Sequence, residues 1–265
     1  MSEHPVPPRP NEPAAPAGLA DLIAQAAEPA GEDDDRRRRI RALAALVPVL
    51  SRSAKASGFR AVAAGRWLTD EIVELAPRIV VRDAATLRRQ YPNLDDAQIA
   101  DSLVRTAVRT TAALGAAAGG LAAVEFTAPP ALLAAPIQLA AEMLTVTAVE
   151  LKLVAELHEI TGRAAVGSRT ERAGAYLAAW LHRRAVPQQV AAAGLAAVFG
   201  TAAKRELRTQ VLKRLGRSTT TLAPFLAGAV AGAEVNRRAT RSLGEALLEQ
   251  LRPPPEQSWF RQLSH

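Results

Sequence analysis

The sequence TTAALGAAAGGLAAV at residues 110–124 has no charged side chain and consists mainly of alanine, glycine and leucine. It follows a segment with charges at Asp101, Arg105 and Arg109, and we expect both parts to form one helix from about Asp95 to Glu125. Asn93 is the expected N-cap, because Asn side chains accept hydrogen bonds from the first free backbone amides of a helix. This long helix indicates an all-α protein.

A second long helix is predicted after the turn Thr127-Ala128-Pro129-Pro130, and Gly162 marks its end. Its residues repeat with a period of 3.6. One stripe is apolar (Ile137, Ala140, Ala141, Leu144, Ala148, Leu151, Ala155) and the other polar (Gln138, Glu142, Thr145, Lys152, Glu156, Glu159). The predicted fold is therefore a multi-helix bundle around a central long Gly/Ala-rich helical hairpin.

Glycines recur at helical spacing in two predicted helices. Gly115 and Gly119 form a GxxxG pair followed by Gly120, and Gly228 and Gly232 form a second pair near the C-terminus. Each glycine inside a helix costs about 1 kcal/mol relative to alanine, so their repeated use predicts helix backbones that pass very close together. We interpret these five glycines as helix-packing positions.

The remaining chain predicts shorter helices around the hairpin and one last large helix or helix pair at residues 219–251. Patterns and breakers place them at residues 36–50, 59–76, 84–91, 168–185, 187–199, 203–215 and 219–251. Pro48 is expected to kink or end the first of these, and Pro77 to stop the second. We divide the chain into a disordered, acidic, Pro-rich leader (1–35), a single helical domain (36–251) and a flexible tail (252–265).

Charge is distributed unevenly over the 265 residues. The whole chain has 33 Lys+Arg against 26 Asp+Glu, yet the first 35 residues contain eight acidic side chains and only Arg9 as a base. The body is therefore basic and attracted to polyanions, and the leader has the charge to mask it; a plain solvated surface is the alternative. The chain has no cysteine and no signal-peptide pattern, so we expect a cytoplasmic location.

Membrane contact is predicted to be peripheral. The uncharged runs are short and rich in Ala and Gly compared with the roughly 20 apolar residues that a spanning helix needs. A soluble bundle is favoured over a helical hairpin inserted shallowly into one leaflet. In either case Arg105, Arg109 and Lys152 favour anionic head groups.

No motif of a known catalytic or nucleotide-binding site occurs in the sequence, so we assign no catalytic residue, metal or cofactor. Glu125 and Glu142 are the candidate buried polar or ligand-binding carboxylates, since a carboxylate in apolar surroundings must be paired, protonated or functional. Arg105, Arg109 or Arg163 are possible partners. A di-iron arrangement needs Glu-x-x-His spacing, which is absent here. Nucleic acid is an unlikely partner, because few aromatic residues are available for stacking on bases.

The central and final segments resemble the EcsC family, a bacterial group named for a protein encoded beside an ABC transporter. The resemblance lies in Ala100–Arg105, Ala113–Gly120, Ala128-Pro129-Pro130, Glu156–Gly162 and the closing segment Pro224–Gly232 with Asn236 and Gly244. It implies membrane association or accessory work for a transporter, and adds Asn236 to the buried polar candidates. We therefore expect a noncatalytic protein at the cytoplasmic face of the membrane, its partner an anionic membrane surface or a membrane protein. The alternatives are a soluble ligand- or metal-binding bundle or enzyme that uses Glu142 and neighbouring carboxylates, and a nonspecific nucleic-acid binder.

Overall fold

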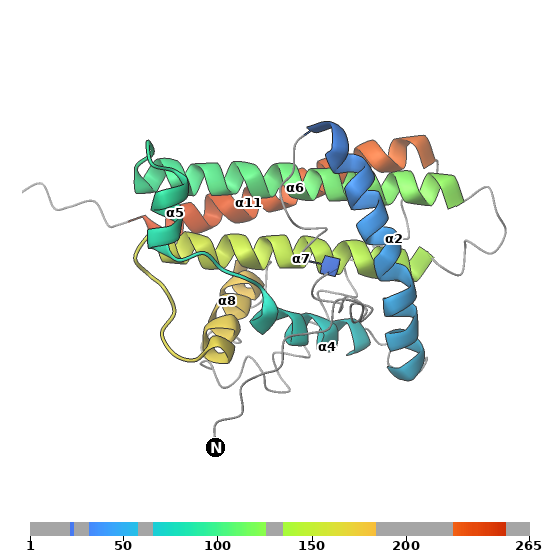
Figure 1. The fold of residues 1–265 in the computed structure, drawn as a ribbon, viewed down its shortest axis with the longest axis horizontal. Helices are drawn as coiled ribbons and strands as arrows, with labels where there is room; N and C mark the ends of the chain where they lie inside the picture. Colours follow the sequence, from blue (N-terminus) through green and yellow to red (C-terminus); the bar gives the residue numbers. More distant parts are fainter. Residues whose placement is uncertain (1–21, 24–31, 58–65, 126–134, 184–224, 253–265) are drawn as a thin grey trace, which may run out of the picture.

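The computed structural model describes residues 22–23, 32–57, 66–125, 135–183 and 225–252. These residues form seven α-helices and one 3-10 turn, and no strand occurs among them. The predicted all-α multi-helix bundle is confirmed (Figure 1).

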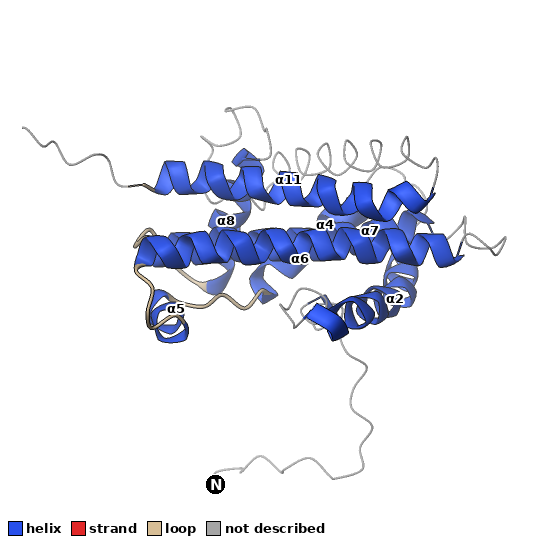
Figure 2. Ribbon diagram, turned by 90° about the horizontal axis from the view of Figure 1, so that it is seen from above, coloured by secondary structure: helices blue, strands red, loops and turns tan. Residues whose placement is uncertain are grey.

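Three long helices form the body of the bundle: α6 (Asp96–Glu125), α7 (Ala135–Ile160) and α11 (Phe225–Leu251). Figure 2 shows α6 and α11 side by side along most of their lengths. The Val104 side chain packs on Gly244 and Gly115 faces Gly232, so the two helices are antiparallel. The bundle is thus closed by its last helix, which packs on a helix formed more than a hundred residues earlier.

The two ends of the central hairpin are fixed by capping. The Asp95 side chain accepts a hydrogen bond from the Gln98 amide (2.8 Å), and the Gln98 side chain accepts one from the Asp95 amide (3.0 Å). This reciprocal capping box starts α6 at Asp96, so the expected cap at Asn93 is wrong by two residues. After α7, Gly162 has a φ of 70°, which favours glycine and ends the helix as predicted.

Helix α7 is buried on nearly all sides, because α2, α4, α6, α8 and α11 all pack against it. Its apolar residues Leu144, Val154 and Leu157 are 0% exposed. Part of the polar stripe is buried as well, with Thr145 at 0% and Glu156 at 2% exposure. Such a helix needs internal partners for its polar groups, and these define much of the chemistry below.

The other described elements cover this body: α2 (Glu32–Ser57), α4 (Arg66–Leu75), the 3-10 turn η1 (Ala76–Arg78), α5 (Ala84–Gln90) and α8 (Arg169–Arg183). Pro48 lies inside α2, so it does not end that helix. Its neighbours Leu46 and Leu50 are fully buried, and their packing outweighs the roughly 3 kcal/mol that an internal proline costs.

Two described parts of residues 1–35 do not fit the predicted disordered leader. Ile23 is 1% exposed and belongs to the hydrophobic core, and α2 begins at Glu32 rather than Arg36, so the acidic run lies in its first turn. Negative charge there is favoured by the helix dipole. The helices expected at 187–199 and 203–215, most of the leader and nearly all of the tail lie outside the described residues.

Candidate functional site

A surface groove of about 720 Å³ runs between α6 and α11. Its floor contains Val104, Val108 and Ala112, each less than 9% exposed. Four arginines line it: Arg105 and Arg109 from α6, Arg237 and Arg241 from α11. The helices are antiparallel, so arginines far apart in the sequence meet along one channel.

The arginines of the groove are exposed, and three of them have no ion-pair partner among the described residues. Arg237 lies 3.4 Å from the Glu234 carboxylate, which also pairs with Arg238 at 2.7 Å. Among the described residues, no carboxylate lies within ion-pair distance of Arg105, Arg109 or Arg241. Four arginines and two carboxylates, those of Asp101 and Glu245, line the described groove, and this excess of positive charge favours an anion.

Close contact of the two helix backbones sets the depth of this groove. A Cβ atom on Gly115 would lie 2.6 Å from the Gly232 carbonyl oxygen and 2.8 Å from the Asn236 amide nitrogen. Gly119, Gly120 and Gly228 lie in the same two helices, but their surroundings fall outside the described residues. The small residues Ala112, Ala113, Ala116 and Ala233 beside the contact leave the groove hollow.

A buried chain of hydrogen bonds joins four helices beneath the groove. Thr111 of α6 donates to Thr240 of α11 (2.9 Å), and Thr240 donates to Glu150 of α7 (2.9 Å). Trp180 of α8 donates to the other carboxylate oxygen of Glu150 (2.8 Å). Glu150, Thr111 and Thr240 are each 0% exposed, so this chain fixes the relative position of the helices.

Two of the three predicted polar candidates meet in the structure. The Asn236 amide donates a hydrogen bond of 2.8 Å to the Glu142 carboxylate, joining α11 to α7. The side chain of Glu125, the last residue of α6, falls outside the description. The predicted arginine partners lie elsewhere: Arg105 and Arg109 line the groove, and Arg163 donates to the backbone carbonyl of Gln250.

The far part of α7 carries two paired carboxylates. Glu156 accepts two hydrogen bonds from the Arg82 guanidinium, at 2.7 and 2.6 Å, and pairs with Lys152 at 2.9 Å. The hydrogen bond to Glu156 raises the pKa of Arg82. Lys152, which is partly exposed, also donates to the Val80 carbonyl.

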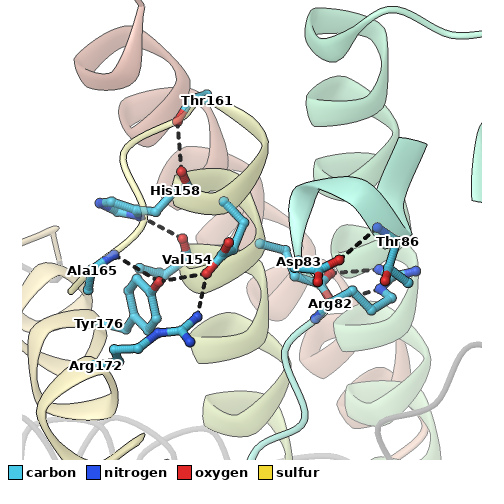
Figure 3. A network of polar contacts seen from close by, with 11 residues as sticks. Arg82, Asp83, Thr86, Val154, His158, Thr161, Ala165, Arg172 and Tyr176 are labelled. Carbon is cyan, nitrogen blue, oxygen red and sulfur yellow. Dashed lines mark hydrogen bonds and ion pairs between the residues drawn. The ribbon is translucent and has the colours of Figure 1, made fainter. Parts of the chain in front are cut away.

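The Glu159 carboxylate is also paired, in this case with side chains of α8 (Figure 3). Arg172 donates to it at 2.5 Å, and the Tyr176 hydroxyl donates at 3.3 Å while accepting from the Ala165 amide. Beside it, the His158 ring is hydrogen-bonded to the Val154 carbonyl at 2.7 Å, and burial lowers the pKa of His158. A second cleft, of about 250 Å³, lies between η1, α7 and α8.

The described residues contain no cluster of three or more His, Cys, Asp or Glu side chains arranged to hold a metal. Among the same helices, none is both long enough and apolar enough to cross a bilayer. Comparison with known protein families, curated proteins and solved structures gave no significant match. The chemistry of the groove is therefore the main guide to function.

Sequence analysis missed the groove and the buried chain around Glu150. Arg105 and Arg109 were noted on α6, but pairing them with Arg237 and Arg241 requires the register of α6 against α11. The sequence nonetheless contained a signal. Charged residues recur every four positions at 101, 105 and 109 and again at 237, 241 and 245, which places each set on one helix face.

Proposed function

We propose that this protein is a noncatalytic peripheral protein that binds the anionic cytoplasmic face of a membrane, with the α6–α11 groove as its contact surface. The observation that carries the proposal is the set of exposed arginines at the groove, three of which have no carboxylate of the described residues within ion-pair distance. Near an anionic membrane, each basic side chain contributes about 1 kcal/mol of attraction at physiological ionic strength.

The EcsC resemblance supports the same setting, since it implies membrane association or accessory work for a transporter. Membership of that family remains a prediction. The alternative of a ligand or metal held by Glu142 has less support, because the Glu142 carboxylate already accepts a hydrogen bond from Asn236. Nucleic-acid binding has less support too, because the described lining of the groove has no aromatic side chain to stack on bases.

Cosedimentation with liposomes tests the proposal. The full-length protein is compared on neutral and anionic vesicles at low and high salt, beside the variant Arg105→Gln/Arg241→Gln. The control Arg52→Gln/Lys55→Gln removes the same charge from exposed positions on α2. We expect binding to anionic vesicles that weakens with salt and falls in the groove variant but not in the control. Equal loss in both variants, or no binding to anionic vesicles, would contradict the proposal.

A further inference from the structure

The charged side chains of the α6–α11 groove lie in one half of its length, together with the apolar Val104, Val108 and Leu248, whereas only alanines line the other half of the described groove. On α6 the lining residues run from Asp101, Arg105 and Arg109 to the alanines at 112, 113 and 116. On α11 they run in the opposite chain direction, from Glu245, Arg241 and Arg237 to Ala233. Because the helices are antiparallel, both charged halves lie at one end of the groove and both alanine halves at the other.

The apolar end continues beyond Ala233. Val230 precedes Ala233 by three residues, about one helical turn, so it lies on the same face of α11. Its side chain is 73% exposed, an unusual position for a large apolar group. The open apolar surface thus extends the alanine-lined end rather than standing apart from it.

The dimensions suit one hydrocarbon chain. From Arg109 to Ala116 the groove follows α6 for about 10 Å, at a rise of 1.5 Å per residue. With C–C bonds of about 1.5 Å, an extended zigzag of about eight carbons covers that length. At the other end, Asp101 and Glu245 lie beyond the arginines and repel an anion, which confines a negative head group to the arginine segment.

We propose that the groove binds a single anionic amphiphile lengthwise, with its phosphate or carboxylate head between Arg105, Arg109, Arg237 and Arg241 and its chain along Ala113, Ala116 and Ala233. This inference rests on the proposed function, because it assigns a ligand to the same arginines. It goes further by requiring a saturable site for one molecule, whereas attraction to a charged surface requires none.

Isothermal titration calorimetry of the full-length protein with octyl phosphate, at concentrations where the probe is monomeric, tests this site. We expect one molecule bound per chain, with affinity rising from inorganic phosphate through butyl to octyl phosphate. Each buried methylene increases affinity by roughly three- to fourfold. Octanoate is expected to bind at the same site, and octyltrimethylammonium, with the same chain and the opposite charge, is expected not to bind.

Two groove variants distinguish binding of the head group from binding of the hydrocarbon chain. Arg105→Gln/Arg241→Gln removes two head contacts and is expected to weaken octyl phosphate binding roughly tenfold or more. Ala116→Leu fills the chain end and is expected to abolish the gain from butyl to octyl phosphate while leaving binding of butyl phosphate unchanged. Ala85→Leu on exposed α5 and Arg52→Gln/Lys55→Gln on α2 are the matched controls, and circular dichroism verifies the fold of each variant.

Each remaining outcome overturns the inference. Inorganic phosphate binding as tightly as octyl phosphate would show a head-group site without a chain. No saturable octyl phosphate binding, with anionic liposomes still bound, would remove the inference and leave the proposed function standing. Loss of octyl phosphate binding together with loss of liposome binding would contradict both the inference and the proposed function. Unchanged octyl phosphate affinity in both groove variants would place the ligand elsewhere.

Discussion

Gly115 faces Gly232 so closely that a Cβ atom on Gly115 would lie 2.6 Å from the Gly232 carbonyl oxygen. The reverse substitution is less severe, because a Cβ on Gly232 would lie 3.1 Å from the Gly115 carbonyl oxygen. The contact is between backbones, so it cannot be relieved by rotating a side chain. The two glycines therefore set the separation of α6 and α11.

Gly115→Ala is expected to lower the free energy of unfolding by about 1 to 3 kcal/mol, because overpacking outweighs the gain in helix propensity. Gly232→Ala is expected to cost less, in line with its longer contact. Chemical denaturation of both variants measures the two effects. If Gly115→Ala proves as stable as the natural protein, the backbone contact between the two helices is not as described.

Removing either donor to Glu150 is expected to destabilise the bundle. Trp180→Phe and Thr240→Val each leave a buried carboxylate with one hydrogen bond fewer, at a cost of about 1 to 3 kcal/mol. Because both act on one carboxylate, the double variant is expected to differ from the sum of the single effects. Thr170→Val, at an exposed position of α8, is the control. If the losses of unfolding free energy in the two single variants add exactly in the double variant, or if neither single variant loses stability, the two donors do not belong to one shared buried network.

The ion pair between Arg82 and Glu156 is expected to matter more than the exposed pair between Arg88 and Asp96. Glu156 is 2% exposed, and Arg82→Met leaves it with Lys152 as its remaining cation, at an expected cost of about 1 to 3 kcal/mol. Arg88→Gln breaks a solvent-exposed pair and is expected to leave the unfolding midpoint unchanged. Thermal unfolding of the two variants side by side distinguishes them, and equal effects would contradict the burial argument.

His158 is expected to make stability depend on pH. Burial lowers its pKa in the folded chain below the ordinary value of 6.5, so the unfolded chain binds a proton more readily. Its contribution is complete above that ordinary value and is lost as the pH falls toward the lower pKa of the folded state. The unfolding midpoint should therefore decrease from pH 7.5 to pH 5.5, and His158→Gln should flatten this decrease. An identical pH profile in the variant would show that other groups cause it.

Local structure was largely predictable from the sequence, because uncharged runs and capping residues act over short distances. Both central helices and α5 lie close to their expected positions. Pro48 does not end α2, because the burial of Leu46 and Leu50, which outweighs its cost, depends on helices distant in sequence. The groove could not be predicted for the same reason, since it depends on contacts between distant segments. Arg109 and Arg237 become neighbours only when Gly115 packs against Gly232, and no local pattern specifies that register.

The distance along the chain between α6 and α11 also governs how the protein is made. Thr111 and Thr240, which share a hydrogen bond, are 129 residues apart. At about 5 to 20 residues per second, a ribosome needs roughly ten seconds to travel from one to the other. During that time Gly115 of α6 lacks its contact with Gly232, and Glu142 and Glu150 of α7 lack the hydrogen bonds from Asn236 and Thr240. A chain released before Phe225 is therefore an incomplete bundle with apolar surface exposed, prone to aggregation or dependent on a chaperone.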